Sequence, residues 1–350
     1  MVKSSVNESR YAKHSQSHSE WYHSRRRADT AKFTFLDLFA GIGGIRLALE
    51  GVGGSCVFSS EWDPHCQETY RFNFGEVPHG DINSIPLAEI PHARLLAGGF
   101  PCQPFSSIGR REGFHHKTQG NLFFRIIEIL EHFRSSGQPI EMILLENVEG
   151  LTTLVHEGEK VIDAVRRELD SVGYEIDYRV LDAVHFGVPQ HRRRVYIVGV
   201  NREICGDGPI IDWEFPRVDV PPVGSLLEAD IQDHPISNHL QKVYISKKQD
   251  GRPQRINRET TEPVKTLVST YHKIQRLTGT FVEDGPTGLR LLTRRECRDI
   301  MGFPREFEIP AWVSRTQAYR QFGNSVTPPV VEAIAERLVS RGQRNKKSAA

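Results

Sequence analysis

The sequence has little of what would indicate export, a membrane span or a metal centre. Its five cysteines are odd in number and form no Cys-x-x-Cys pair, which argues against a disulfide framework or a zinc site. No apolar run reaches the roughly 18 residues of a bilayer span, and the N-terminus lacks the apolar core of a signal peptide. None of the 15 histidines falls in a His-Glu-x-x-His spacing. We therefore expect a cytoplasmic protein with no metal and no membrane contact.

Net charge is also nearly absent, at +1 over 350 residues, but the charges are unevenly placed. From Lys242 to Arg276, nine Lys and Arg stand against three Asp and Glu, and the preceding stretch 201–241 is acidic. A local basic excess suits a surface that meets phosphates. An ordinary solvated surface explains the same excess at least as well.

Changes in composition and apolar pattern divide the sequence into five parts. We expect a polar, disordered basic tail at 1–31, a catalytic and cofactor-binding domain at 32–201, a smaller loop-rich domain at 202–287, a return to the first domain at 288–341, and a short tail at 342–350. Within 32–201, apolar strand patterns alternate with helical ones, which predicts a mostly parallel α/β sheet covered on both faces. The expected strands are 33–39, 57–60, a short one closed by Asp81-Ile82, 93–97, 140–145, 174–182 and 194–200, and the expected helices are 45–50, 64–73, 122–133 and 158–171. Thr293 and Glu296 form a capping box that begins another helix.

A glycine-rich turn follows the first expected strand, at Gly41-Ile-Gly43-Gly44. It departs from the dinucleotide fingerprint because Arg46 occupies the third glycine position, so a cofactor with a nucleoside but no pyrophosphate fits better. Glu61, at the end of the second strand, stands where such folds bind ribose hydroxyls. Trp62 offers a face for adenine, and Asp81 an acceptor for its amino group.

Cys102 follows a strand that ends in Gly98-Gly99, and it stands between two prolines. Glycines allow a sharp bend and prolines fix the direction of the loop, so the thiol is expected at the carboxyl end of a strand, where α/β sheets place ligands. Glu146 ends another buried strand, where a raised pKa would suit a proton donor. Arg192 and Arg194 lead into a further buried strand and therefore need anionic or carbonyl partners.

These stretches together resemble the C5-cytosine DNA methyltransferase family. The resemblance covers roughly 33–200 and 289–338, in the motif order of the family. It is carried by Asp37-Leu-Phe-Ala-Gly-Ile-Gly-Gly44, Gly98-Gly-Phe-Pro-Cys-Gln-Pro-Phe-Ser106, Glu146-Asn-Val148, Gln190-x-Arg192-x-Arg194, Arg290-Leu-Leu-Thr-Arg-Arg-Glu-Cys297 with Met301-Gly-Phe-Pro304, and Gln321-Phe-Gly-Asn-Ser-Val326.

The resemblance implies a Rossmann-like, S-adenosyl-L-methionine-dependent fold whose smaller domain recognises the target. It implies methyl transfer to C5 of a cytosine flipped out of double-stranded DNA. Cys102 would attack C6, Glu146 would protonate N3, Arg194 would hold the base through its carbonyl oxygen, and Arg192 would contact a backbone phosphate. The cofactor would lie against Phe39, Gly41 and Gly43, with Glu61 on the ribose, Trp62 and Ile82 on either side of adenine, Asp81 on its amino group, and Asn324 and Ser325 closing the pocket.

By the same resemblance, the glycine-containing basic stretch 103–120 is a mobile lid over DNA, and Thr266-Leu267 matches a pair often found in the recognition domain. We expect a monomer that protects host DNA from a restriction endonuclease of the same specificity, without a stable complex between the two. Three alternatives stay open. A tRNA-methylating branch is disfavoured because it carries a Cys-Phe-Thr element that is missing here. A catalytically dead DNA-binding regulator is disfavoured by the intact Cys102, Glu146 and Arg194, and a nicotinamide oxidoreductase by Arg46.

Overall fold

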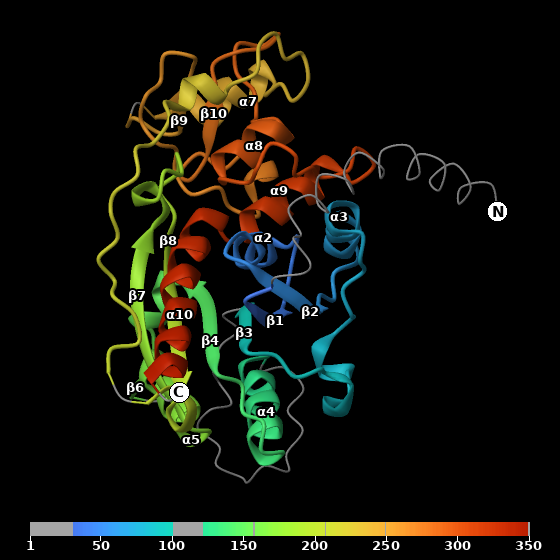
Figure 1. The fold of residues 1–350 in the computed structure, drawn as a ribbon. Helices are drawn as coiled ribbons and strands as arrows, with labels where there is room; N and C mark the ends of the chain where they lie inside the picture. Colours follow the sequence, from blue (N-terminus) through green and yellow to red (C-terminus); the bar gives the residue numbers. More distant parts are fainter. Residues whose placement is uncertain (1–30, 101–121, 157, 207, 249, 349–350) are drawn as a thin grey trace, which may run out of the picture.

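The computed structural model describes residues 31–100, 122–156, 158–206, 208–248 and 250–348. Within these ranges, helices cover a six-stranded sheet, and a group of short elements lies beyond one end of it (Figure 1). No helix in the described ranges combines the length and apolarity needed to cross a membrane. The basic tail predicted at 1–31 lies outside the described residues, apart from residue 31. The short tail predicted at 342–350 is part of a helix as far as Ser348.

The sheet follows the order β2-β1-β3-β4-β8-β7, with the first four strands parallel and β8 antiparallel to both of its neighbours. Its strands are β1 (Phe33–Leu38), β2 (Gly54–Ser60), β3 (Leu95–Gly99), β4 (Met142–Val148), β7 (Tyr174–Asp182) and β8 (Arg193–Asn201). The predicted α/β sheet is confirmed. Its last two pairings are antiparallel because the connection 183–192 holds only a 3-10 turn and no crossover helix. The order reverses between β1 and β3, which is the switch point where such sheets bind ligands.

Alternation along the strands gives the sheet two apolar faces. Phe33 and Phe35 of β1 pack on the side of α2 and α10, whereas Leu36 and Leu38 pack on the side of α4 and α5. The helices around the sheet are α2 (Gly44–Gly51), α3 (Pro64–Phe74), α4 (Leu122–Ser135), α5 (Val161–Ser171), α6 (Arg202–Cys205) and α10 (Pro328–Ser348). Both faces are therefore covered, as the sequence predicts.

The group beyond the sheet contains α7, β9 and β10 at its far end, with α8 and α9 between them and the sheet (Figure 1). These elements are α7 (Asn238–Val243), β9 (Gln254–Ile256), β10 (Thr280–Val282), α8 (Arg294–Ile300) and α9 (Arg315–Asn324). Buried side chains from 223–282 share one core with those of α8 and α9 and with Tyr70 and Phe74 of α3. The core thus continues through the predicted boundary at 287/288, and the chain returns to the sheet only at α10.

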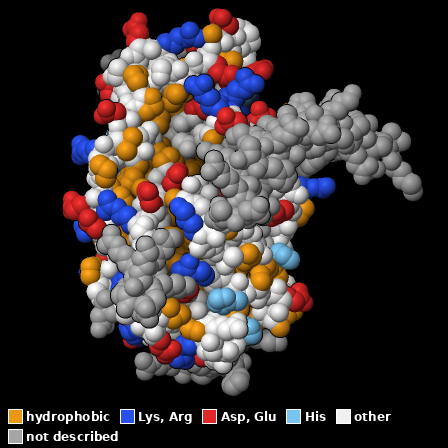
Figure 2. All heavy atoms as spheres, in the orientation of Figure 1, with side chains coloured by type: hydrophobic (Ala, Val, Ile, Leu, Met, Phe, Trp, Pro, Cys, Tyr) orange, Lys and Arg blue, Asp and Glu red, His pale blue; other side chains and the backbone are white. Residues whose placement is uncertain are grey.

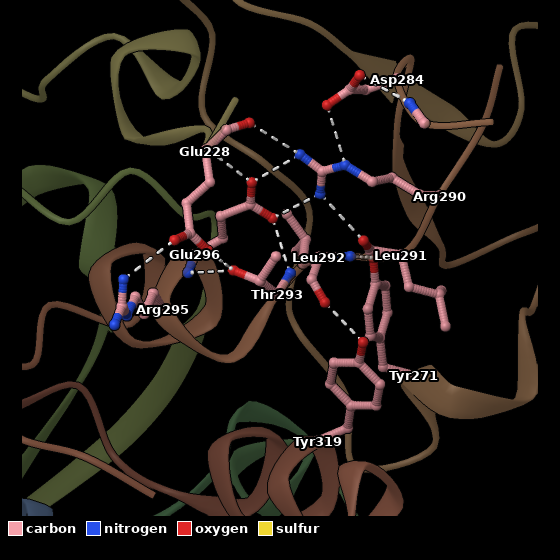
Figure 3. Close-up of polar contacts among 11 residues, drawn as sticks. Glu228, Tyr271, Asp284, Arg290, Leu291, Leu292, Thr293, Arg295, Glu296 and Tyr319 are labelled. Carbon is pink, nitrogen blue, oxygen red and sulfur yellow. Dashed lines mark hydrogen bonds and ion pairs between the residues drawn. The ribbon is translucent and has the colours of Figure 1, made fainter. Parts of the chain in front are cut away.

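A buried ion pair fastens α8 to this core. The Arg290 guanidinium donates to both carboxylate oxygens of Glu296, at 2.9 Å each, and neither side chain is exposed (Figure 3). Glu296 also completes the predicted capping box with Thr293, which is confirmed. Its Oε1 accepts from the backbone N–H of Glu228 at 2.9 Å as well. The Glu296 carboxylate therefore caps the start of α8 and also binds the loop that contains Glu228.

One sequence-based expectation about an element is wrong, and one helix that is confirmed starts later than expected. The segment closed by Asp81-Ile82 is not a strand: it pairs with β2 only at a single bridge, between Ser60 and His79, and continues as a 3-10 turn at Ile82–Ser84. Pro78 lacks the N–H that a longer ladder would need. The helix expected at 158–171 begins at Val161, after a small hairpin of β5 (Val155–His156) and β6 (Glu159–Lys160). The other short turns are η3 (Leu87–Glu89), η4 (Glu149–Thr152), η5 (Ala183–His185), η6 (Val223–Leu226), η7 (Ile245–Lys247) and η8 (Tyr271–Lys273).

Candidate active site

The glycine-rich turn joins β1 to α2 at the switch point of the sheet. Phe39, Gly41 and Gly43 all have positive φ, at 56°, 56° and 87°. A Cβ on Gly43 would lie 2.1 Å from the ring of Phe74 in α3, so this position admits no side chain. Among the described residues, a Cβ on Gly41 would come within 4 Å of the Phe39 carbonyl oxygen alone, at 4.0 Å. The turn is thus packed against α3 at Gly43, whereas the described residues leave space beside Gly41.

Glu61 holds this turn in place. Its carboxylate accepts from the backbone N–H of Gly41 and of Asp63, at 2.8 Å each. Burial raises the pKa of Glu61, and the two N–H donors pull it back down. Each carboxylate oxygen keeps a lone pair after these bonds, so Glu61 can still accept from the hydroxyls of a ribose. The neighbouring Trp62 is 74% exposed, which leaves an indole face open to a ligand.

Residues from the other end of the chain lie against the same turn. The Ser325 Oγ is 2.9 Å from where a Cβ of Gly44 would be, and Asn324 beside it is exposed. Ile82 is buried, and the exposed Asp81 accepts from the backbone N–H of Asn83 at 3.0 Å. The structure thus brings Glu61 and Ser325 to the glycine turn. The contacts of Trp62, Ile82 and Asp81 with adenine stay predictions.

A residue of the first motif that the sequence analysis assigned no role is Asp37 in β1. It is fully buried, and neither carboxylate oxygen has a hydrogen-bond partner in the part of the chain that is described. Burial raises the pKa of Asp37 to about 8, against the pull of the nearby Arg46. A buried, unpaired carboxyl two residues before Phe39 suits a site that takes a polar ligand.

Glu146 lies one strand away from the end of β3. Gly99 of β3 and Glu146 of β4 are paired in register, and the Glu146 Oε1 lies 3.1 Å from the Arg194 Nε. Burial raises the pKa of Glu146, while Arg194 and, less strongly, Arg192 lower it. The chain enters the Pro-Cys sequence directly after this pairing. Cys102 and the predicted lid 103–120 lie outside the described residues.

Asn147 is a further residue that the sequence analysis left without a role. Its side chain is buried, and its Nδ2 donates to the carbonyl oxygen of Phe100 at 2.9 Å. Phe100 is the last described residue before the Pro-Cys sequence. Asn147 therefore fixes the point from which that loop departs, and its position directly after Glu146 was the signal that could have revealed it.

Arg192 differs from the expectation of a phosphate contact. The side chain is buried and donates to three backbone carbonyls: Leu267 at 3.0 Å, Gly323 at 2.9 Å and Ser325 at 2.6 Å. Burial lowers the pKa of this guanidinium. The carbonyls explain how an arginine can enter a buried strand, and they leave Arg192 no path to DNA in this structure. It joins Leu267, in the group beyond the sheet, to Gly323 and Ser325, which lie beside the glycine turn.

The backbone of 264–267 forms the rest of this connection. The Gln190 Oε1 accepts from the Leu267 N–H at 2.8 Å, and its Nε2 donates to the Ile300 carbonyl at 3.3 Å. Val264 exchanges backbone hydrogen bonds with Pro189 and His191, at 3.0 and 2.8 Å. We refer to residues 264–267 as the recognition seam.

We expect replacement of Arg192 by methionine to lower the free energy of unfolding by about 3 kcal/mol, because three buried carbonyls lose a charged donor. The adjacent Arg193 is exposed and pairs with Glu149, so Arg193→Met should cost under about 1 kcal/mol. Urea unfolding of both variants measures the difference. Equal losses in the two proteins would contradict the bridging role of Arg192.

Not all of the basic excess of 242–276 is available at the surface. Arg276 is buried, pairs with Asp250 and donates to the Lys248 carbonyl at 2.9 Å. On the face shown in Figure 2, positive and negative side chains are interspersed over this end of the molecule. The net charge of this segment therefore overstates the positive charge that it exposes.

A sheet of this order, with a glycine turn at its switch point, is the arrangement in which α/β enzymes bind nucleotide-like ligands. The sequence model of the C-5 cytosine-specific DNA methylase family matches residues 33–340. The chain belongs to this family of DNA cytosine methyltransferases.

Two relatives agree with this assignment over most of the chain. Type II methyltransferase M.MspI of Moraxella sp is 49% identical over 340 residues, covering 95% of this chain and 77% of that protein. Type II methyltransferase M.BsuFI of Bacillus subtilis is 48% identical over 313 residues, covering 89% of this chain and 73% of that protein. Among solved structures, S. pombe Dnmt2 methyltransferase superposes with a TM-score of 0.72 at 22% identity, covering 88% of this chain and 98% of that one. This last likeness concerns the fold alone.

Proposed function

We propose that the protein methylates C5 of a flipped-out cytosine in one short DNA sequence, through a covalent bond between the Cys102 sulfur and C6. The observation that carries this proposal is the register of β3 and β4. It sets the strand that leads into Cys102 beside the Glu146–Arg194 pair. Relatives named Type II methyltransferases support DNA as the substrate.

The cofactor we propose is S-adenosyl-L-methionine, and the residues of the turn fit it. Glu61 has lone pairs for the ribose hydroxyls, Gly41 leaves open space beside the turn, and Trp62 presents an exposed ring. When bound, this cofactor supplies an electrophilic methyl group on a sulfonium. Phe39, Gly43, Asp81, Ile82, Asn324 and Ser325 complete the set of residues that we propose to hold it.

The side chains of the chain activate the base. C5 of cytosine is a weak nucleophile, so bonding of the Cys102 thiolate to C6 is needed to make C5 electron-rich. The Glu146 carboxyl donates its proton to N3, which prevents negative charge from building up on the ring. Arg194, paired with Glu146, holds the base through its carbonyl oxygen. Once C5 carries the methyl group, its proton passes to water and the sulfur–C6 bond breaks. The electrons of that bond return to sulfur as the thiolate, and N3 returns its proton to Glu146.

Bisulfite sequencing tests the function as a whole. DNA from a bacterial host without cytosine methylation of its own, expressing this chain, should carry 5-methylcytosine at one short recurring sequence. The same DNA should resist a restriction endonuclease of that specificity, as expected of a protective enzyme. Unmodified DNA together with methylated cellular RNA would overturn the proposal in favour of an RNA substrate.

A further inference from the structure

One buried amide joins two stretches that we propose to hold the cofactor and that are far apart in the sequence. Glu61 and Trp62 come just before α3, whereas Asn324 and Ser325 stand at the end of α9. Gln321 of α9 connects the two stretches, and it is only 3% exposed. No step proposed above uses this side chain.

The Gln321 amide makes two hydrogen bonds to α3. Its Oε1 accepts from the hydroxyl of Thr69 at 2.9 Å, and its Nε2 donates to the carbonyl of His65 at 2.7 Å. A carbonyl can only accept, so the amide nitrogen must face His65 and the amide oxygen must face Thr69. Thr69 is fully buried, which shields the bond at its hydroxyl from water. The bridge therefore specifies one position of the first turns of α3 relative to α9.

The main chain of Gln321 holds the end of α9. Its carbonyl accepts from the backbone N–H of Ser325 at 3.0 Å. The Ser325 Oγ lies 2.9 Å from where a Cβ of Gly44 would be, which is beside the glycine turn. Gln321 thus contacts one side of the proposed cofactor pocket through its backbone, and its side chain contacts the other side by way of α3.

The start of α3 is bonded in turn to Glu61. Asp63 caps the helix by accepting from the N–H of His65 at 2.9 Å, and its own N–H donates to the Glu61 carboxylate at 2.8 Å. The other oxygen of Glu61 accepts from the N–H of Gly41 at 2.8 Å. A shift of His65 therefore displaces Asp63 and, with it, the carboxylate that would bind the ribose.

The group beyond the sheet holds α9 on its other side. A Cβ on Gly323 would lie 2.2 Å from the backbone nitrogen of Ser269, so helix and segment are in close contact there. The hydroxyl of Tyr319 donates to the carbonyl of Leu292 at 2.6 Å. Because these contacts fix α9, the Gln321 amide sets the position of the first turns of α3.

We infer that Gln321 is a positioning residue for the cofactor: it holds the Glu61 side of the pocket at a fixed distance from the Ser325 side. This inference rests on the proposed function, since S-adenosyl-L-methionine is the cofactor proposed there. Cofactor affinity then depends on the bridge. The chemistry at the base does not, because Glu146 and Arg194 lie on β4 and β8 and not on α3 or α9.

The test is calorimetric binding of S-adenosyl-L-homocysteine, the demethylated form of the proposed cofactor, to the full chain. Gln321→Leu removes both hydrogen bonds of the bridge and should weaken binding about tenfold, the factor that one or two net hydrogen bonds supply. Thr69→Val removes only the hydroxyl and should weaken binding about threefold. In methyl transfer by Gln321→Leu, the KM for the cofactor should rise as the Kd does, with kcat within about twofold of wild type.

The matched control is Asn73→Leu, at the other end of α3. The buried Asn73 amide also bridges α3 to a distant segment, because it donates to the carbonyl of Glu308 at 2.8 Å and accepts from its N–H at 3.0 Å. About 12 Å of helix separates Asn73 from His65. Asn73→Leu should therefore lower the midpoint of urea unfolding at least as much as Gln321→Leu, but leave the affinity for S-adenosyl-L-homocysteine within about twofold of wild type.

Gln321→Glu gives a second readout, through pH. The ionised carboxylate can still accept from Thr69 but repels the carbonyl of His65, whereas the protonated carboxyl donates to that carbonyl as the amide does. Burial raises the pKa of the introduced carboxyl. The ratio of the Kd of this variant to that of wild type should therefore fall toward one as the pH is lowered through that pKa. The same ratio for Asn73→Leu should stay constant.

Three outcomes would overturn the inference alone. They are unchanged binding in Gln321→Leu, equal weakening in Gln321→Leu and Asn73→Leu, and a fall in kcat without a rise in the KM for the cofactor. Equal weakening would make the bridge an ordinary contribution to stability. Absence of binding by the wild-type protein would instead overturn the proposed cofactor, and the inference with it.

Discussion

Replacement of Cys102 by alanine is expected to lower methyl transfer by at least about 10⁴-fold, the scale seen when an enzyme loses its nucleophile. Without a bond to C6, C5 of cytosine stays too electron-poor to take a methyl group. The adduct itself can be observed. Duplex DNA with 5-fluorocytosine at the target should trap wild-type protein covalently in the presence of cofactor, because fluorine cannot leave C5 as a cation.

The matched control is Cys66→Ala, since Cys66 is a partly buried thiol in α3. This variant should form the adduct at the wild-type level, as judged by a shifted band on a denaturing gel. An adduct that persists in Cys102→Ala would exclude Cys102 as the nucleophile, whatever the activity of that protein.

Replacement of Glu146 by glutamine is expected to slow single-turnover methyl transfer by about 10²–10⁴-fold, the usual contribution of a general acid. Glutamine keeps the size of the side chain but has no acidic proton for N3. Cofactor affinity, measured by calorimetry, should change little because Glu61 and the glycine turn are separate from Glu146. The exposed Glu175 of β7 provides the control, and Glu175→Gln should behave as wild type.

The raised pKa of Glu146 also predicts how the rate of methyl transfer changes with pH. Burial raises the pKa of Glu146, so the proton needed at N3 is present at a higher pH than in an exposed glutamate. The wild-type rate should therefore fall as pH rises through that pKa. In Glu146→Gln this descending limb should disappear, leaving a lower rate that no longer falls with pH. A descending limb that survives in the variant would assign the limb to another group.

Much of the fold could be predicted because its strands are short apolar runs between recognisable turns. Gly41 and Gly43 mark a bend that only glycine adopts easily, and the Thr293–Glu296 capping box marks a helix start. The antiparallel end of the sheet was less visible, because nothing in the apolar pattern of 174–200 distinguishes a hairpin from a crossover. The sequence also did not predict that α8 shares a core with the preceding domain. The pattern of α8 shows which of its faces is apolar, but not which part of the chain covers that face.

The sequence predicted which residues belong to the site better than it predicted which groups those residues contact. Sequence reasoning asked for anionic or carbonyl partners for Arg192, and only the folded chain shows that three carbonyls from distant segments meet it. Asp37 and Asn147 were missed for the same reason: their burial and contacts depend on what surrounds them. Burial around one carboxyl is a three-dimensional property that a linear pattern does not contain.

The recognition seam is held almost entirely through main-chain atoms. Gln190 and Arg192 bind the N–H and carbonyl of Leu267, and Pro189 and His191 bind those of Val264. Such contacts fix the course of the backbone and do not depend on most of the side chains in the segment. The loops on either side can therefore change in sequence while residues 264–267 keep the same position against the catalytic half.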